Sequence, residues 1–371
     1  MGKIVRIERI GCLGIGEGYY PFLYSGRPNG AKIIDNRCDK PIGAPLFLDV
    51  YPSMECNFNC KFCYNKLFGI ASKSSSMSKK TINEIIKLCS KSGIPKINIL
   101  GGEPLHPNIR RQVYYLAEKC REKEIKTDIT TNGSFLGKKI VNFCNKNKVD
   151  LNVSFHAVNE VTASKIAGVK KYDIKKNILE YLDGKTEYGI SVAVLKDNYK
   201  EFDEIFDFIN GLQCRNMVLR YPTMRQEESV PLNEFFALYE KYRKKCNKKI
   251  ILDAPFAYRF LNAKPPENKL DFLYAGCKAG LLKAEILPDG DVFSCILFAN
   301  RKDQRIGNVN ESVDFKKEYI NKLELKFSNS SCVYSSFCTG CPAYAELQGL
   351  AFDNRCGGCD EKNKSERDCS V

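Results

Sequence analysis

Three cysteines lie close together in the chain and could form one metal site. Cys56, Cys60 and Cys63 fall within a stretch of eight residues. Thiolates are soft ligands, which zinc and iron–sulfur clusters prefer. A four-iron cluster takes four ligands, so three cysteines would leave one iron free to bind and activate another molecule. The alternative is three ordinary thiols on a loop, because a chain with 18 cysteines also produces this spacing by chance.

A second candidate segment contains two glycines, a carboxylate and a proline. Gly101, Gly102, Glu103 and Pro104 follow a predicted strand. Glycine permits a close approach of the backbone to a ligand, and the carboxylate could accept a hydrogen bond from an ammonium group. Taken alone, the segment is equally typical of an ordinary turn.

A third candidate lies at the end of the strand predicted over residues 149–155. Ser154 and His156 share one face of this strand because side chains alternate between faces. We expect His156 to bind or deprotonate a substrate. The alternative is a histidine whose hydrogen bonds are satisfied by a neighbouring loop.

The C-terminal part of the chain is rich in cysteine. Its eight cysteines are Cys277, Cys295, Cys332, Cys338, Cys341, Cys356, Cys359 and Cys369. The region has little apolar periodicity, so we expect bound metal to hold it together. Four of these cysteines form the pattern C-x2-C-x14-C-x2-C, which is close to that of a zinc ribbon. Zinc therefore stays open as an alternative to iron.

Composition and charge restrict the class of protein. The chain has 371 residues, of which 43% are hydrophobic and 27% charged, which is typical of a globular protein. It contains neither a long apolar run nor a secretory signal, so we expect a cytoplasmic protein without disulfides and without a membrane partner. The net charge of +14 is uneven: residues 1–270 carry +16 and residues 271–371 carry −2. The simplest explanation is a lysine-rich, solvated surface. The alternative is an acidic partner, which would be a peptide, a nucleotide or a reductase, and nucleic acid is not expected.

The elements that must position these residues alternate regularly. Strands are predicted over residues 46–51, 96–100, 125–131, 149–155, 189–195 and 216–220, with helical periodicity between them. Alternating strands and helices predict a parallel sheet with right-handed crossovers. Polar residues recur on one strand face: Asp49, Asn98, Asp128, Thr130 and Arg220. A polar inner face favours an α/β fold with a partial (β/α)6 barrel, whose chemistry would lie at the C-terminal strand ends.

This pattern predicts four segments. Residues 1–45 form an N-terminal extension, 46–250 the barrel, 251–276 a linker and 277–371 the cysteine-rich domain. A hairpin is predicted around the turn Pro288-Asp289-Gly290. Seven further cysteines are interpreted as ordinary, mostly buried thiols: Cys12, Cys38, Cys89, Cys120, Cys144, Cys214 and Cys246.

The first two candidate segments together resemble the radical S-adenosylmethionine (SAM) family. The family's C-x3-C-x-aromatic-C motif corresponds to Cys56, Cys60, Phe62 and Cys63, and its Gly-Gly-Glu motif to residues 101–103. The resemblance implies that the three cysteines hold a [4Fe–4S] cluster whose open iron chelates SAM. It also implies which residues bind SAM. Phe62 would lie against the adenine, and Gly102 and Glu103 near the methionine amino group. The other implied SAM-binding residues are Gly101, Pro104, Asn132 and Ser154.

The C-terminal region resembles the SPASM extension of radical SAM enzymes. The resemblance rests on the stretch from Cys277 through Gly290 to Cys295, and on Gly340-Cys341-Pro342. It implies two auxiliary [4Fe–4S] clusters held by the eight C-terminal cysteines. The sequence departs from the family's C-x2-C-x5-C-x3-C pattern, because Asn329 replaces the first cysteine and the last spacing is one residue short.

The two resemblances together imply a radical SAM/SPASM enzyme. Reductive cleavage of SAM would give a 5′-deoxyadenosyl radical that abstracts hydrogen from a substrate, which we expect to be a peptide or protein. The implied partners are an electron donor of the flavodoxin or ferredoxin type and a separate leader-binding protein. One alternative is a dehydrogenase or rearrangement enzyme acting on a small molecule. A second is a non-enzymatic iron–sulfur or zinc scaffold.

Overall fold

The computed structural model of the chain describes residues 4–8, 11–15, 21–24, 32–35, 43–67, 76–256, 277, 279, 280, 282–315, 340–350, 353 and 355. Within these ranges, no helix has the length and apolar character needed to cross a membrane. Cys38, Cys332, Cys338, Cys356, Cys359 and Cys369 lie outside them, and for Cys12 only the backbone is described. The predictions for these cysteines are therefore not addressed by the structure.

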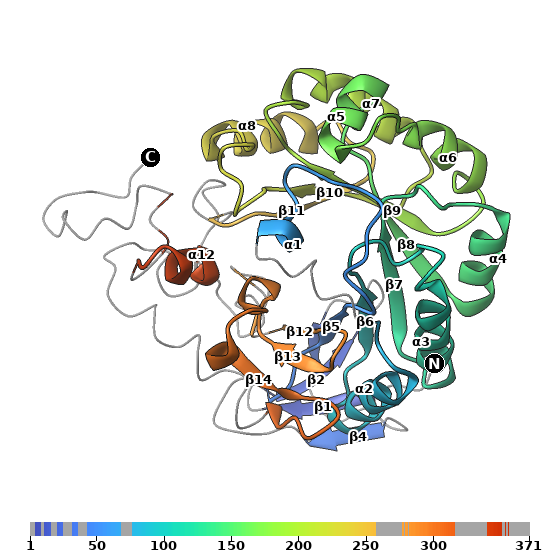
Figure 1. The fold of residues 1–371 in the computed structure, drawn as a ribbon, viewed down its shortest axis with the longest axis vertical. Coiled ribbons are helices and arrows are strands. Elements are labelled where there is room, and N and C mark those ends of the chain that lie inside the picture. The colour runs from blue at the N-terminus through green and yellow to red at the C-terminus, as the bar shows by residue number, and fades with distance from the viewer. Residues whose placement is uncertain are drawn as a thin grey trace, which may run out of the picture.

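One curved sheet of ten strands forms the body of the protein (Figure 1). Its spatial order is β11-β10-β9-β8-β7-β6-β5-β12-β13-β14, and the pairs from β11 to β12 are all parallel. The strands are β5 (Phe47–Val50), β6 (Lys96–Ile99), β7 (Lys126–Thr131), β8 (Val149–Ser154), β9 (Tyr188–Ala193), β10 (Asn216–Arg220), β11 (Lys249–Asp253), β12 (Lys283–Ile286), β13 (Asp291–Phe293) and β14 (Arg305–Asn308). The predicted α/β partial barrel is confirmed, and its six predicted strands lie side by side.

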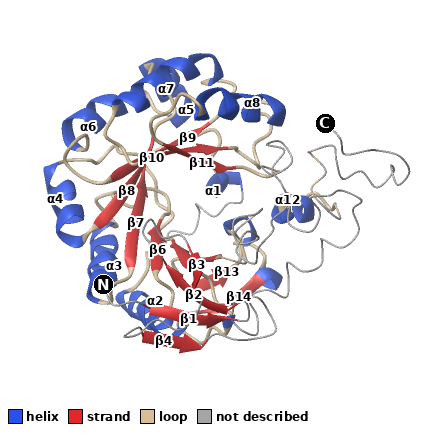
Figure 2. Ribbon diagram, turned by 180° about the vertical axis from the view of Figure 1, so that it is seen from behind, coloured by secondary structure: helices blue, strands red, loops and turns tan. Residues whose placement is uncertain are grey.

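Helices cover the outer, convex side of this sheet (Figure 2). They are α2 (Lys79–Ser92), α3 (Arg110–Glu122), α4 (Lys138–Asn147), α5 (Glu160–Ala167), α6 (Ile174–Tyr181), α7 (Phe202–Gly211) and α8 (Leu232–Arg243). Local sequence explains their limits. In α2, the Ser78 hydroxyl accepts from the Thr81 N–H, and Gly93 ends the helix at φ 64°. The apolar face of α2 packs into the core, as its periodicity predicts.

The sequence analysis did not predict α5, although its capping signals are clear. The Asn159 side chain accepts from the N–H groups of Val161 and Thr162, and Gly168 ends the helix at φ 64°. Asparagine before and glycine after a helix are standard start and stop signals. The short length of α5 hid its periodicity.

Charged pairs line the inner face of the sheet. The Asn98 amide donates to Asp49 over 2.7 Å, and Lys283 lies 3.0 Å from Asp49. Lys96 pairs with Asp128 at 2.6 Å. Farther along the sheet, Lys126 and Arg215 both pair with Asp150. The predicted polar inner face is therefore confirmed, and ion pairs between neighbouring strands satisfy it.

Two strands extend the sheet beyond the prediction. At one edge β11 crosses the expected domain boundary at residue 250, so the barrel continues to Asp253. On the other side of the six predicted strands, β12 from the cysteine-rich region pairs in parallel with β5. The predicted hairpin is confirmed by the antiparallel pairing of β12 with β13. The cysteine-rich region thus begins as part of the barrel sheet.

A separate sheet precedes the barrel within residues 1–45. Its strands are β1 (Ile4–Glu8), β2 (Gly11–Ile15), β3 (Pro21–Tyr24) and β4 (Lys32–Asp35), in the order β3-β2-β1-β4. Repeated glycine and proline hid these short strands from the periodicity analysis. Among the ordinary thiols, four are buried as predicted and the fifth is half-buried: Cys89, Cys120, Cys144 and Cys214, and then Cys246.

Candidate functional site

The three cysteines lie on a loop that leaves the C-terminal end of β5. We call residues 56–63 the cluster loop. Its backbone is fixed to the C-terminal end of α5, since the N–H of Asn59 donates to the Ala167 carbonyl over 2.9 Å and that of Lys61 donates to Ile166 over 3.1 Å. Gly168 is needed there because a Cβ would lie 2.3 Å from the Asn59 carbonyl oxygen. The short helix α1 (Tyr64–Leu67) follows the loop.

The three thiols of the cluster loop are a donor set that suits an iron–sulfur cluster. Burial, together with the neighbouring thiols, raises the pKa of Cys60 to about 12, and burial raises that of Cys56 to about 11. Without a cation these two thiols are therefore protonated, and metal binding would release their protons. Among the described residues, no three metal-ligating side chains converge on one ion. A cluster does not need such convergence, because each thiolate binds a different iron.

The two glycines of the Gly-Gly-Glu segment allow the chain to pass very close to the start of the cluster loop. A Cβ on Gly101 would lie 2.2 Å from the Ser53 carbonyl oxygen, and one on Gly102 would lie 2.0 Å from that of Glu55. The N–H of Gly102 donates to Ser53 and that of Glu103 to Glu55. The close approach expected of these glycines is thus made to the protein's own backbone, which fixes the cluster loop to the end of β6.

Glu103 is fully buried and ties three segments together. Its Oε1 accepts from the Thr131 hydroxyl over 2.6 Å and from the Leu105 N–H over 2.9 Å, while its Oε2 accepts from the Asn132 N–H over 2.7 Å. Burial raises the pKa of Glu103 to about 7. Pro104, next in the chain, is also buried. The carboxylate therefore orients the ends of β6 and β7 beside the cluster loop.

Asn132 joins the cluster loop from the other side. Its amide Nδ2 donates to the Asn57 side chain over 3.0 Å, and Asn57 in turn donates to the Ser134 hydroxyl over 3.0 Å. Ser154 ends β8 on the inner face, and its hydroxyl makes no hydrogen bond to any residue that the structure describes. Ser154 is thus an available polar group, whereas Asn132 is already engaged.

His156 lies against Phe62 of the cluster loop. Their rings meet edge to face, with centroids 4.9 Å apart. The Ala193 N–H donates to Nδ1 of His156 over 3.1 Å. Burial, and then the positive charge of Arg220, lower the pKa of His156 to about 4. The ring is therefore neutral near pH 7, with its proton on Nε2, and this arrangement favours donation to a ligand over proton abstraction.

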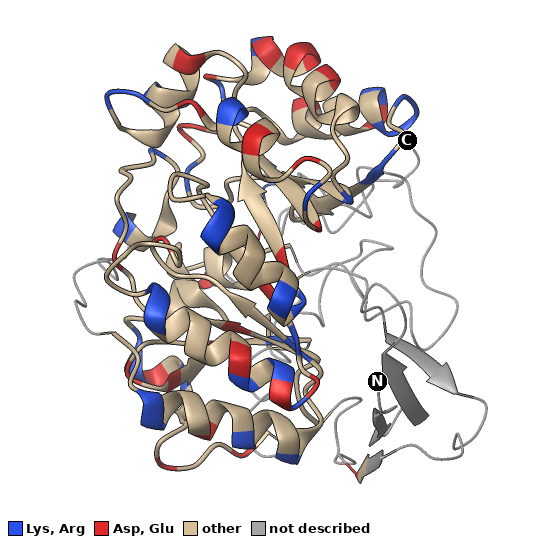
Figure 3. Cartoon of the chain, turned by 90° about the vertical axis from the view of Figure 1, so that its right-hand side faces the viewer, with Lys and Arg blue, Asp and Glu red and all other residues tan. Residues whose placement is uncertain are grey.

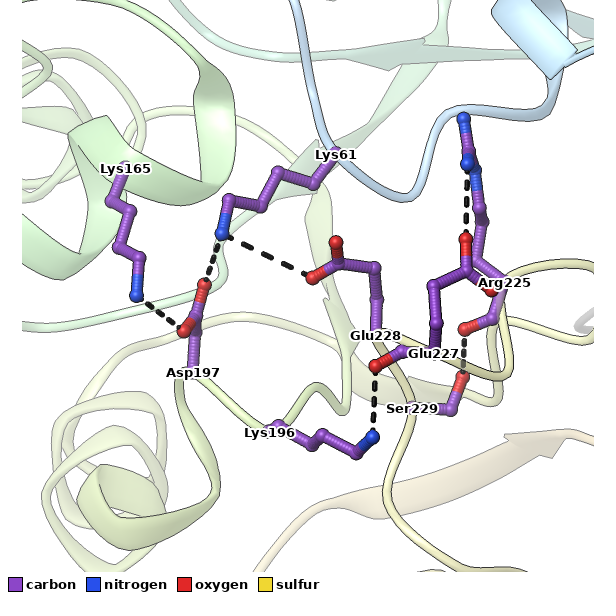
Figure 4. A network of polar contacts seen from close by, with 8 residues as sticks. All are labelled: Lys61, Lys165, Lys196, Asp197, Arg225, Glu227, Glu228 and Ser229. Carbon is purple, nitrogen blue, oxygen red and sulfur yellow. Dashed lines mark hydrogen bonds and ion pairs between the residues drawn. The ribbon is translucent and has the colours of Figure 1, made fainter.

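Lys61 connects the cluster loop to two loops at the C-terminal ends of strands (Figure 4). Its ammonium lies 3.0 Å from Asp197, after β9, and 4.0 Å from Glu228, after β10. Asp197 also pairs with Lys165 of α5 at 2.6 Å. Sequence analysis missed this network because its members are far apart in the chain. The only local signal was a lysine inside the cysteine motif.

Cys295 and Cys341 pack against one buried apolar cluster at the C-terminal ends of β5 and β6, and Cys277 is close enough to affect both electrostatically. Burial raises the pKa of Cys295 well above its ordinary value and that of Cys341 to about 12, and the nearby Cys277 thiol raises both further. Cys341 precedes α12 (Pro342–Leu347), where its N–H donates to Asp353 over 2.8 Å. The structure thus groups three of the eight predicted C-terminal ligands.

A buried polar chain joins the two groups of thiols. Tyr64, next to Cys63, has its hydroxyl 3.4 Å from that of Tyr51. The Tyr51 hydroxyl donates to Glu285 of β12 over 2.8 Å, and Lys283 pairs with Glu285 at 2.7 Å. Both Tyr51 and Glu285 are almost completely buried. These contacts fix the cluster loop relative to the cysteine-rich region.

Comparisons with known proteins show which family and fold the chain is similar to. Residues 50–209 match the model of the radical SAM superfamily. A probable GTP 3′,8-cyclase of Thermoplasma volcanium is 30% identical over 194 residues, which cover 50% of this chain and only 56% of that protein. The GTP 3′,8-cyclase of Campylobacter fetus subsp. fetus is 28% identical over 298 residues, which cover 74% of this chain and 88% of that protein.

The fold is similar to that of SuiB from Streptococcus suis. The structure of SuiB bound to S-adenosylmethionine has a TM-score of 0.76 at 18% identity, covering 95% of this chain and 98% of that one. SuiB bound to the precursor peptide SuiA gives a TM-score of 0.75 at 17% identity, with the same coverage. At this identity the likeness concerns the fold, and it extends over the barrel and the C-terminal region together.

Proposed function

We propose that this chain, whose residues 50–209 match the radical SAM superfamily, is a radical SAM enzyme that modifies a peptide or protein substrate. The bound cluster and SAM would supply a 5′-deoxyadenosyl radical that abstracts hydrogen from the substrate. Cys56, Cys60 and Cys63 hold the cluster. Gly101 and Gly102 keep the loop that carries these thiolates against β6.

The residues around the loop bind SAM and shield the radical. Glu103 fixes the ends of β6 and β7, where the methionine amino group would lie. Ser154 supplies a hydroxyl on the inner face, and His156 supplies its Nε2 proton as a donor to the substrate rather than to SAM. Phe62 packs against His156 and contributes an apolar wall that excludes water.

The cysteine-rich region holds auxiliary [4Fe–4S] clusters, as the SPASM resemblance implies. The grouping of Cys277, Cys295 and Cys341 supports this part of the proposal. Five further ligands come from Cys332, Cys338, Cys356, Cys359 and Cys369. Burial raises the pKa of these thiols. Each cluster would bind them as thiolates and balance their negative charge, which offsets the cost of burying that charge.

The observation that carries the peptide proposal is the likeness to SuiB over 95% of this chain, including the region that follows the barrel. SuiB has been solved with a precursor peptide bound. The alternative is a small-molecule substrate, which the similarity to GTP 3′,8-cyclases over 74% of this chain favours. The family match favours an enzyme of either kind over a non-enzymatic scaffold.

Two assays test the proposal. The anaerobically reconstituted protein is first incubated with dithionite and SAM, and 5′-deoxyadenosine is measured by chromatography. A peptide encoded by a small neighbouring reading frame, or GTP, is then added, and each mixture is analysed by mass spectrometry. We expect a mass change in the peptide and none in GTP. Conversion of GTP with an unchanged peptide would contradict the peptide proposal.

A further inference from the structure

Part of the cluster loop is exposed to solvent, and its two asparagines have no role in the proposed chemistry. Cys56, Asn57 and Asn59 are exposed, whereas Phe62 points toward His156. A substrate that reaches Ser154 and His156 approaches from the inner face of the sheet. The exposed side of the loop is therefore available to a different partner.

Lysines gather beside this exposed side. The C-terminal end of α5 is fixed to the loop by the hydrogen bond from Asn59 to Ala167. Three lysines at this end form what we call the lysine surface: Lys165, Lys170 and Lys171. The side chains of Lys165 and Lys171 are 57% and 77% exposed. Lysines and arginines are also frequent on other helices of the barrel (Figure 3), so what distinguishes these three lysines is their position beside the cluster loop.

Nearby carboxylates only partly neutralise the lysine surface. Lys165 pairs with Asp197 at 2.6 Å, but Glu160 is 3.8 Å from Lys171 and largely solvated. Within the part of the chain that the structure describes, Lys170 has no ion-pair partner. The positive charge of the lysine surface has the same sign as that of the surrounding part of the chain, since residues 1–270 carry +16 and residues 271–371 carry −2. An acidic protein would be steered toward the barrel and away from the C-terminal region.

We propose that the lysine surface is the docking site of an acidic one-electron carrier protein of the flavodoxin or ferredoxin type. The inference rests on the proposed function, because a carrier is useful only if the cluster loop holds a reducible cluster. In each encounter one electron leaves the reduced carrier, which is oxidised by one electron, and enters the cluster held by Cys56, Cys60 and Cys63. No bond forms or breaks in this step. Docking here brings the carrier to the exposed part of the cluster loop, which contains Cys56 and Asn59.

The test compares two charge-reversal variants with the wild type. Lys170→Glu/Lys171→Glu changes the lysine surface while leaving Lys165 and its contact with Asp197 intact. The control, Lys91→Glu/Lys123→Glu, makes the same charge change at the C-terminal ends of α2 and α3, which lie at the opposite end of the barrel. Formation of 5′-deoxyadenosine is measured with reduced flavodoxin and, separately, with dithionite. Binding of oxidised flavodoxin is measured by calorimetry.

We expect the lysine-surface variant to need at least about tenfold more flavodoxin than the wild type to reach half of its maximal rate. Its affinity for flavodoxin should fall by a similar factor. The control should stay within about twofold of the wild type, and added salt should reduce the difference. With dithionite all three proteins should be equal. The proposal would be overturned if flavodoxin bound both variants equally weakly, or if it bound the lysine-surface variant as tightly as the wild type. Loss of the dithionite-driven reaction in the lysine-surface variant would also overturn it.

The same experiment separates this inference from the proposed function. If the wild type forms no 5′-deoxyadenosine even with dithionite, the proposed chemistry is wrong. The calorimetric comparison of the two variants still decides whether the lysine surface binds the carrier.

Discussion

The Lys61 ammonium lies 3.0 Å from the Asp197 carboxylate and joins the cysteine motif to the loop after β9. The next residue in that loop, Asn198, donates to the carbonyl groups of His156 and Ala193. Ala193 in turn donates to the His156 ring. The loop after β9 thus contacts both the cluster loop and His156, which is expected to face the substrate. A shift of the cluster loop would therefore displace His156, and the reverse.

Replacing Asp197 by Asn should loosen the cluster loop. Burial raises the pKa of Asp197, but hydrogen bonds from Lys165 and Lys61 lower it more, so the pKa lies below its ordinary value. The stabilisation is therefore present at neutral pH and is lost as the pH falls through the folded-state pKa. We expect a loss of about 1 kcal/mol in the free energy of unfolding, measured with urea at pH 7. The control Asp203→Asn, which breaks a well-exposed pair with Lys241, should change less.

Replacing Cys56, Cys60 and Cys63 together by Ala should abolish SAM cleavage. Iron should fall from about twelve to about eight per chain, since one of three four-iron clusters is lost. Anaerobic iron analysis and the 5′-deoxyadenosine assay measure both effects. The control Cys246→Ala removes a half-buried thiol outside the proposed sites and should change neither. Cleavage at the wild-type rate in the triple variant would refute the assignment of these ligands.

The metal content of the wild type distinguishes clusters from zinc in the C-terminal region. Two auxiliary clusters, together with the cluster at Cys56, Cys60 and Cys63, predict about twelve irons per chain without zinc. Replacing Cys277, Cys295 and Cys341 by Ala should remove iron while leaving the dithionite-driven cleavage of SAM measurable. About four irons and one zinc in the wild type would instead support a zinc ribbon and contradict the SPASM resemblance.

Ala at Gly101 or Gly102 should displace the cluster loop. The new Cβ would lie within 2.2 Å of a carbonyl oxygen in either case, so the backbone must move. We expect a loss of about 2 kcal/mol or more in stability together with the iron of one cluster. Gly211→Ala is the matched control, because no atom lies within 4 Å of its Cβ position and Ala suits the end of α7. Full iron content in the Gly102 variant would mean that the loop tolerates the shift.

His156 should destabilise the protein in mild acid. Its pKa of about 4 in the folded state lies below that of the unfolded chain, so the unfolded state binds a proton first as the pH falls below about 6.5. Between pH 7 and pH 5.5 this should remove about 1 kcal/mol of stability in the wild type. In His156→Gln the loss should be smaller. The control is His106→Gln at the other histidine of the chain, and an equal pH dependence in all three proteins would contradict a buried neutral His156.

His156 should also matter for turnover of the peptide in a way that depends on hydrogen bonding. His156→Gln keeps a donor and an acceptor, whereas His156→Leu keeps neither. We expect the Leu variant to lose about tenfold or more of peptide turnover and the Gln variant to lose less. SAM cleavage without substrate should stay within about twofold of the wild type in both. Normal turnover in the Leu variant would assign His156 to packing alone.

The sequence by itself determined the features that arise from short-range pattern. The period of apolar residues gave the order of six strands and their helices, with β10 predicted at its observed bounds. Alternation along the strands placed Asp49, Asn98 and Asp128 on one face, and the structure pairs them there. The spacing of the cysteines and the Gly-Gly-Glu segment located the candidate site. Side-chain direction and helix periodicity follow from local geometry, so a linear pattern reveals them.

Only the tertiary structure decided which distant residues meet. Lys61 and Asp197 are 136 positions apart, and Tyr51 and Glu285 are 234 apart. No local pattern records such contacts, because they depend on how the sheet curves and on β12 joining it beside β5. The reason for the two glycines was hidden in the same way, since the carbonyl groups that exclude a Cβ belong to another segment. The local pattern indicated the candidate ligands, and long-range packing determines how they are held in place.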